Sequence, residues 1–399
     1  MSSSPVAALA IEHGARGPAF VRNRVLLALL VCALAAALGL AFLTVAPNRL
    51  VSGTGVALHE LLTGTRLALG LPGAGLLLAV LAPPSRGGHA LVAVLAALLL
   101  AGLVGLAGDE AVLRSASLPA IARVSFGGGF WVLALLAWLA AADALQRLPL
   151  RPAVRTLAHA AVLLPVGVLL GSGALDQLSL LKEYANRQDV FFAAGWRHLQ
   201  IVAATLAPSL LLGVPLGVAA ARNARLARGL FALLNAVQTV PSIALFGLLI
   251  APLVWLAETL PGWGIRGIGL LPAVIALTLY ALLPIVHGMA SGLRQVPVAA
   301  IAAATGMGMT RAQLFRRVEL PLALPVLLSG VRVTTVQVIG LAVVAALIGA
   351  GGLGALVFQG LASSALDLVL LGVVPVVALA IVADAGLGLL TAALAGRPR

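Results

Sequence analysis

Long apolar runs alternate with short clusters of charged residues along this chain of 399 residues. A membrane-spanning helix needs about 20 mostly apolar residues, and inside a bilayer only helices and closed barrels satisfy their own backbone hydrogen bonds. The pattern therefore predicts an all-α polytopic membrane protein with about ten transmembrane helices. Their approximate ranges are 25–45, 65–82, 90–107, 128–145, 153–170, 199–221, 231–255, 269–291, 326–348 and 368–394.

Composition excludes a soluble protein, because 62% of the residues are hydrophobic and only 9% are charged, against about 25% charged in soluble domains. Cys32 is the single cysteine, so an intrachain disulfide and a cysteine-rich metal site are excluded as well. The first apolar run, 25–45, is longer than the apolar part of a cleaved signal peptide. We therefore expect the first helix to be retained.

The charged residues predict the orientation in the membrane. With a cytoplasmic N-terminus, 17 of the 25 basic residues face the cytoplasm, among them Arg16, Arg397 and Arg399, while about four of the 12 acidic residues do. This asymmetry follows the positive-inside rule and accounts for the net charge of +13 without nucleic acid as a partner. We expect both termini in the cytoplasm. The basic residues left outside are Arg49, Arg66, Arg114, Arg123, Lys182, Arg187, Arg197 and Arg266.

A polar stretch at 171–198 divides the chain into two groups of about five spans. We expect residues 1–170 to form an N-terminal accessory membrane domain and residues 199–399 to form a second membrane domain. The charge pattern places the linker 171–198 on the outer, periplasmic side. Helix-forming residues from Leu178 to Tyr184 predict a short surface helix that ends near Asn186, in what is otherwise a solvated connector.

A second polar stretch, 294–321, predicts a helical hairpin on the cytoplasmic side. Alanines from Val298 to Thr305 favour a first helix, and Gly306 and Gly308 allow a tight turn. Thr310, with Gln313 three residues later, has the spacing of a capping box, and Pro321 is expected to end the second helix. The hairpin is either an amphipathic element on the membrane surface or a docking element for another protein.

The hairpin resembles the coupling loop of the binding-protein-dependent ABC importer permease family. That loop reads E-A-A, three residues, G, nine residues, an aliphatic residue, any residue, then L-P. Here Ala303-Ala304, Gly308, Val318 and Leu320-Pro321 occupy these places at matching spacing, and Ala302 stands where the family usually has glutamate. The ATPase-coupling residues that the resemblance implies are Ala302, Ala303, Ala304, Gly306, Gly308, Arg311, Leu314, Val318, Leu320 and Pro321.

Further stretches resemble the osmoprotectant branch of that family. They include His198-Leu199 at the start of a span, QTVPS at 238–242 and IGAGGLGALVFQGL at 348–361, and the N-terminal half is similar to YehY-type glycine betaine permeases. The resemblance implies a MetI-like core in residues 199–399 of a permease in the bacterial inner membrane. It also implies separate ATPase subunits, a periplasmic substrate-binding protein and a second permease subunit, either the same chain or a paralogue.

The resemblance implies import of an osmoprotectant such as glycine betaine by alternating access. No phosphate-binding G-x-x-x-x-G-K-[ST] motif is present, so we expect a partner to hydrolyse ATP and this chain to bind no cofactor. The scattered histidines and carboxylates give no metal or catalytic site, and we expect the chain not to be an enzyme. Few aromatic residues are available for a quaternary-ammonium cage, which leaves selection to the binding protein.

Polar residues within the predicted spans are few, and such residues line a translocation path or join helices by hydrogen bonds. The candidates for the path are Gln238, Pro241, Ser242, Tyr280 and Gln337. The main alternative function is an ion-coupled secondary transporter of small polar solutes, and a passive channel or scaffold comes third. Asp384 is the one carboxylate deep in the last span, and we expect it to form a structural pair there.

Overall fold

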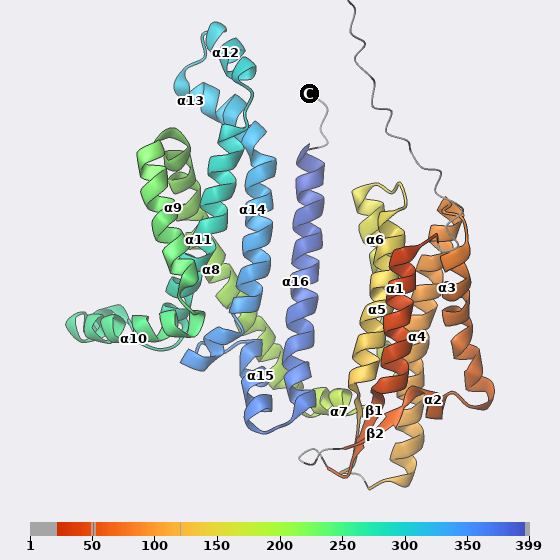
Figure 1. The fold of residues 1–399 in the computed structure, drawn as a ribbon. Helices are drawn as coiled ribbons and strands as arrows, with labels where there is room; N and C mark the ends of the chain where they lie inside the picture. Colours follow the sequence, from red (N-terminus) through yellow and green to blue (C-terminus); the bar gives the residue numbers. More distant parts are fainter. Residues whose placement is uncertain (1–21, 49–50, 52, 120, 396–399) are drawn as a thin grey trace, which may run out of the picture.

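The computed structural model describes residues 22–48, 51, 53–119 and 121–395. Within these ranges, nine helices are long and apolar enough to cross a membrane, which confirms the helical membrane class. They form two groups, residues 24–171 and residues 188–395, that lie side by side (Figure 1). Arg16, Arg49, Arg397 and Arg399, which enter the charge count above, lie outside the described residues.

The first group is a bundle with a core of small and aliphatic residues such as Leu76, Ala96 and Ala141. Pro72 lies in the first turn of α3, where its missing N–H costs no helical hydrogen bond. A 3₁₀ turn over Gly64–Gly70 leads into this helix. The helices of this bundle are α1 (Arg24–Gly39), α2 (Leu58–Leu61), α3 (Leu71–Leu81), α4 (Arg86–Ser117), α5 (Gly128–Gln146) and α6 (Pro152–Gly171).

A small antiparallel sheet closes one end of this bundle, and the prediction of a helix over 25–45 is wrong for residues 40–45. The helix ends at Gly39, and the following residues form the central strand β1 (Ala41–Ala46). Its neighbours are β2 (Thr54–Ala57) and β3 (Arg123–Phe126), with Leu43 opposite Phe126. Because β3 lies far along the chain, its pairing with β1 leaves no local signal in the sequence.

The two groups meet at the end of the molecule that carries the sheet. The predicted short helix is present as α7 (Ser179–Asn186), and Leu178 forms a β-bridge with Val124 of β3. The Ser125 hydroxyl donates a hydrogen bond to Asp367 Oδ2 at 2.7 Å. Strand β3 is therefore tied both to the linker and to the last helix of the second group.

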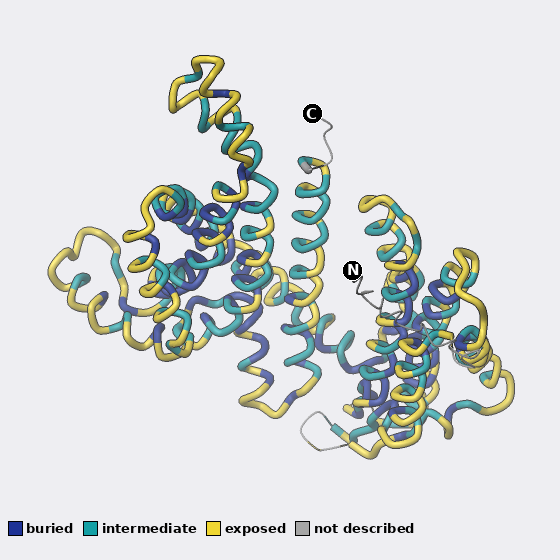
Figure 2. Tube along the Cα trace, turned by 45° about the horizontal axis from the view of Figure 1, so that its top comes forward, coloured by how far each residue is buried: buried dark blue, intermediate teal, exposed yellow. Residues whose placement is uncertain are grey.

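The second group packs around α11 (Leu270–Arg294), which lies between α8 (Gln188–Arg222) and α14 (Leu320–Leu341). Small residues bring these helices close: a Cβ on Gly330 would lie 2.7 Å from the carbonyl oxygen of Pro284. Figure 2 shows that α11 is largely buried. The remaining long elements are α9 (Ala224–Thr239), α10 (Ser242–Thr259), α15 (Leu353–Ala362) and α16 (Leu366–Ala395).

Two predicted spans in this group have different bounds. The range 231–255 is not one helix, because Val240 and Pro241 are extended and separate α9 from α10, which lies across the other helices (Figure 1). Proline lacks an N–H and disfavours helical geometry at the residue before it. The range 326–348 ends early as well: α14 stops at Leu341, and a 3₁₀ turn over Val344–Ile348 follows.

Candidate functional site

The predicted hairpin projects from one end of the second group (Figure 1). Its first helix, α12 (Val298–Gly306), ends at Gly306, and Gly308 has a φ of 77° in the left-handed region. The turn leads to α13 (Arg311–Leu314), where Thr310 and Gln313 form both hydrogen bonds of the capping box. The local backbone predictions for Gly308 and Thr310 are confirmed.

The second helix of the hairpin does not end at Pro321, contrary to prediction. A π turn over Phe315–Glu319 joins α13 to α14, and the Leu320 N–H bonds to the carbonyl of Phe315, five residues back. The wider turn carries the helix past a residue that cannot donate a backbone hydrogen bond. Residues 311–341 therefore form one continuous helix from the hairpin into the bundle.

The proposed coupling residues differ in exposure along the hairpin. Ala302, Ala303 and Arg311 are exposed, whereas Ala304 is buried against the hairpin itself. The large apolar side chains of Val298 and Met307 are 80% and 71% exposed, which leaves an apolar face uncovered in the single chain. The other coupling residues are exposed in the case of Gly306 and Gly308 and half-buried in the case of Leu314, Val318, Leu320 and Pro321.

An ion pair at the base of the hairpin escaped sequence reasoning. Arg222, at the end of α8, lies 3.1 Å from Glu319 and stacks over the ring of Phe315 at 5.4 Å. Glu319 is the only carboxylate in the 294–321 stretch, which is the one signal that could have suggested such a partner. The contact holds the base of the hairpin against a second membrane helix.

A polar cavity of about 970 Å³ lies within the bundle, next to the base of the hairpin. Gln238 of α9 and Gln337 of α14, both predicted for the path, line it. Sequence reasoning missed several other polar residues, of which His287, Ser291 and Gln295 recur every four residues on one face of α11. The missed polar lining residues are Asn235, His287, Ser291, Arg294, Gln295 and Ser329.

Tyr280 does not line this cavity. It is buried, and its hydroxyl donates a hydrogen bond to the carbonyl of Val240 at the break between α9 and α10. Gln238 donates from Nε2 to the carbonyl of Tyr280 at 2.7 Å. Pro241 and Ser242 begin α10 and are absent from the cavity lining. Tyr280, Pro241 and Ser242 therefore lie at the helix break and not in the cavity lining, whereas Gln238 contributes to both.

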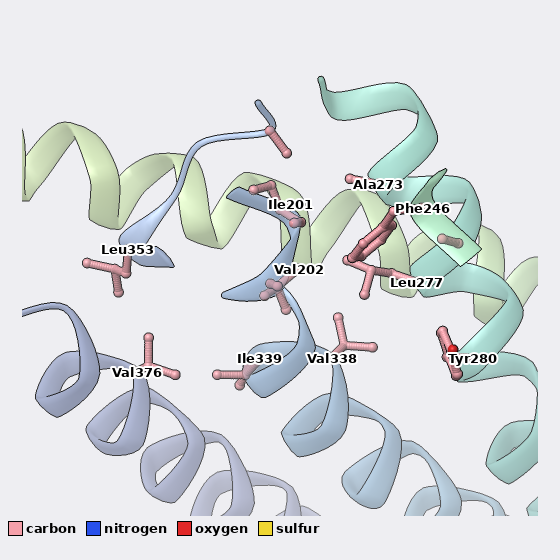
Figure 3. Packing of buried hydrophobic residues seen from close by; sticks show 14 of the residues in the cluster. Ile201, Val202, Phe246, Ala273, Leu277, Tyr280, Val338, Ile339, Leu353 and Val376 are labelled. Carbon is pink, nitrogen blue, oxygen red and sulfur yellow. The ribbon is translucent and has the colours of Figure 1, made fainter. Parts of the chain in front are cut away.

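A buried apolar cluster begins next to the cavity, on the side away from the hairpin. Val338 follows the cavity residue Gln337 directly and is fully buried, as are Ile201 of α8 and Phe246 of α10 (Figure 3). His198 lies at this level, with no exposed surface, and its Nε2 is 3.1 Å from the carbonyl of Ile339. The apolar cluster therefore begins where the polar lining of the cavity ends.

The carboxylate deep in the last helix is paired, as the sequence analysis expected. Arg332 of α14 donates from Nε and Nη2 to the two oxygens of Asp384 on α16. Gly388, one turn further along α16, leaves room for the guanidinium group. Because each oxygen of Asp384 accepts a hydrogen bond from Arg332, the pair joins α14 to α16.

Comparison with known proteins gives matches in both halves of the chain. Residues 22–181 match the N-terminal domain of the ABC transporter permease YehY, and residues 213–396 match the binding-protein-dependent transport system inner membrane component. The osmoprotectant import permease protein OsmW of Salmonella typhimurium is 42% identical over 189 residues, which cover 47% of this chain and 84% of that protein.

Two other proteins are similar to the C-terminal half. The choline transport system permease protein OpuBB of Bacillus subtilis is 38% identical over 189 residues, covering 47% of this chain and 81% of that protein. A structure of the MetNI methionine ABC transporter in an inward-facing conformation aligns with a TM-score of 0.47 at 25% identity, covering 52% of this chain and 97% of that one. The chain belongs to the binding-protein-dependent ABC transporter permeases of the inner membrane, has a YehY-type N-terminal domain, and is a transport subunit and not an enzyme.

Proposed function

We propose that this chain forms the membrane pathway of an importer for osmoprotectants of the quaternary-amine class. Its relatives are named as permeases for osmoprotectants, for choline, and for glycine betaine, carnitine and choline. The cavity supports this class of substrate, since its amide, hydroxyl and imidazole groups offer hydrogen-bonding partners to a small hydrated solute. We expect selection among these solutes to occur in a separate periplasmic binding protein.

The observation that carries the proposal is the direct connection between the hairpin and the cavity wall. Gln337 lies on the same continuous helix, 311–341, that begins at the hairpin tip, and α11 leads from the cavity into α12. The Arg222–Glu319 pair adds α8 to this unit. A displacement of the hairpin by an ATPase therefore reaches three helices of the bundle, two of which line the cavity.

The coupling step follows from this arrangement. ATPase subunits dock on the exposed face around Ala302, Ala303 and Met307 at the cytoplasmic side, and ATP binding moves the hairpin. The cavity closes at that end while the apolar cluster around Val338 and Phe246 opens to the periplasm, which is alternating access. The accessory domain, the periplasmic linker and a second permease subunit complete the membrane part, with both termini in the cytoplasm.

Reconstitution tests this function. The chain is purified with its ATPase and binding-protein partners, placed in proteoliposomes, and assayed for uptake of radiolabelled glycine betaine, choline and carnitine. We expect uptake that requires ATP and the binding protein and that persists when ionophores remove proton and sodium gradients. Uptake that collapses with an ion gradient and ignores ATP would establish the secondary transporter instead.

Gln337→Leu sharpens this assay at the cavity itself. Replacing the amide with an apolar group of similar volume removes one hydrogen-bonding partner from the wall, and we expect uptake to fall about tenfold. Gln359→Leu is the matched control, because Gln359 lies on α15 and does not line the cavity. An equal loss of uptake in the two variants would mean that the loss does not depend on the cavity, and it would contradict the cavity as the transport path.

A further inference from the structure

A second cavity, of about 410 Å³, lies in the N-terminal bundle, to which the proposed function assigns no role. It opens between α3 and α4, beside the start of α1 and the end of α5. The turn that joins α3 to α4 lies at the same end of the molecule as the hairpin (Figure 1). The residues that line it are Arg22, Asn23, Gly75, Leu78, Ala79, Ala82, Pro83, Pro84, Ser85, Gly88, His89, Leu91, Val92, Leu95 and Arg147.

The walls of this cavity are apolar and open sideways. Leu78 and Leu91 are 71% and 54% exposed, and they belong to helices that span the membrane. At Gly75 the helices approach closely, since a Cβ there would lie 2.9 Å from a methyl group of Leu95, and this contact forms the floor of the cavity. A lateral apolar groove on a membrane-spanning helix pair faces lipid, so its natural occupant is an acyl chain.

The other end of the cavity is basic. Arg22, His89 and Arg147 line it, and among the described residues no carboxylate does. Asp143 accepts hydrogen bonds of 2.8 and 3.0 Å from Arg147 and so offsets part of that charge. Arg22 is exposed and forms no ion pair with any residue in the described ranges. The uncompensated charge at the mouth is therefore carried by Arg22.

We infer that this cavity binds an anionic phospholipid, with its acyl chain along α3 and α4 and its phosphate at Arg22 and Arg147. Basic pockets between membrane helices on the cytoplasmic side are suited to acidic headgroups, and the hairpin end is the cytoplasmic side in the predicted topology. The apolar groove and the basic mouth meet in one continuous cavity, which matches the two parts of a single amphiphile.

Binding would also hold the first helix in place. The amides of Arg22 and Asn23 both donate to the carbonyl of Val80 on α3, at 3.2 Å each, and the Asn23 side chain caps α1. A phosphate at Arg22 therefore bridges the start of α1 to the end of α5 across the cavity. The lipid therefore adds a link between α1 and α5 to the backbone hydrogen bonds that join α1 to α3.

The test is a lipid titration of the purified, delipidated full-length chain, followed by native mass spectrometry. The probes are phosphatidylglycerol and phosphatidylcholine with identical acyl chains. We expect phosphatidylglycerol to bind about tenfold more tightly, and Arg22→Gln to remove about fivefold of that preference, as is typical of one basic group near an anionic lipid. Equal binding of the two lipids would overturn the inference.

Matched variants distinguish lipid binding in this cavity from attraction by the general positive charge at this end of the bundle. Arg24→Gln and Arg86→Gln remove the same charge at the same end of the bundle, and neither residue lines the cavity. We expect both to bind phosphatidylglycerol as the unaltered chain does. If either variant loses as much affinity for phosphatidylglycerol as Arg22→Gln does, the preference comes from general surface charge and the proposed site is wrong.

A third variant tests the groove. Leu91→Trp places a large side chain at an exposed position of α4, where folding tolerates it, and it should weaken binding of both lipids at least threefold. Glycerol phosphate, which has a phosphate but no acyl chain, is the last probe. If it binds as tightly as phosphatidylglycerol, or if Leu91→Trp leaves lipid binding unchanged, the acyl chain takes no part and the lipid assignment is wrong.

Discussion

The N-terminal and C-terminal bundles use the same apolar residue types for different interiors. In the first bundle, Phe42, Phe126 and Phe130 pack between the sheet and α5, with ring centroids 4.0 to 5.7 Å apart, as part of a buried apolar core. In the second, α11 touches its neighbours through glycines and also borders a polar cavity of about 970 Å³. The first bundle is therefore joined by aromatic and aliphatic contacts, whereas the second combines close helix contacts with the cavity proposed above as the transport path.

Backbone continuity differs in the same way. The second bundle contains a helix break at Pro241, a π turn at Phe315–Glu319 and glycines of positive φ at Gly349, Gly351 and Gly352. Such features mark places where helices change direction or adjust to movement. The four predictions below test this contrast, from the largest expected effect to the smallest.

Topology gives an all-or-none result. Lys182 is the single lysine, and in the predicted orientation it faces the periplasm while Arg316 faces the cytoplasm. An amine reagent that cannot cross membranes should label Lys182 in intact cells. Burial and the neighbouring charge of Arg123 lower the pKa of Lys182, which leaves more of its amine unprotonated and favours this reaction.

The double change Lys182→Arg and Arg316→Lys moves the single lysine to the hairpin while the net charge stays constant. Its side-chain amine should be labelled only in inverted vesicles. If the lysine is labelled from the same face of the membrane in both chains, Lys182 and residue 316 lie on one side. The predicted orientation of the two bundles is then wrong.

Gly308→Val tests the hairpin as the coupling element. A β-branched residue at a φ of 77° costs about 1–2 kcal/mol and displaces α13 relative to α12. We expect ATP-driven uptake to fall about tenfold while membrane insertion and expression persist.

Gly229→Ala is the control. Gly229 lies within α9, outside the coupling residues, and a Cβ at Gly229 or at Gly308 would meet nothing within 4 Å. The alanine variant should transport normally. Normal uptake and an intact ATPase complex in Gly308→Val would leave the hairpin as a membrane-surface element.

Two glycine-to-alanine changes should have opposite signs in the two bundles. At Gly330 the new Cβ would lie 2.7 Å from the Pro284 carbonyl, so overpacking should lower the free energy of unfolding by about 1–3 kcal/mol. At Gly167 of α6 nothing lies within 4 Å, and the higher helix propensity of alanine should raise it by about 0.5–1 kcal/mol. Thermal melts in one detergent give both values, and equal signs would contradict the close packing of α11 and α14.

Ala302→Glu should have the smallest effect. Ala302 is exposed and helical, so glutamate fits without strain and restores the residue usual in the family. We expect normal uptake and a tighter association with the ATPase by up to about 1 kcal/mol, the range of one exposed ion pair. Titration with the ATPase subunit measures this affinity. Weaker association of the Ala302→Glu chain would contradict the prediction and would indicate that the facing surface of the ATPase is negatively charged.

The features that sequence alone determined depend on residues close together in the chain. Apolar runs of sufficient length specify spans, and the hairpin follows from Gly308, Thr310 and Gln313 within a few positions. Pro321 shows the limit of such rules. A local rule predicted the end of a helix there, whereas the π turn over Phe315–Glu319, which ends two residues before this proline, carries the helix on.

Tertiary structure decided everything that joins distant segments. The pairing of β1 with β3, the Arg222–Glu319 contact and the placement of Asn235 and Ser291 on one cavity all require elements that lie far apart in sequence. Tyr280 resembled a path residue in sequence and proved to fix a helix break, because its hydroxyl reaches the Val240 carbonyl. A polar residue in an apolar run signals only that it has a partner, and packing alone determines whether that partner is a backbone carbonyl, another helix or a solute.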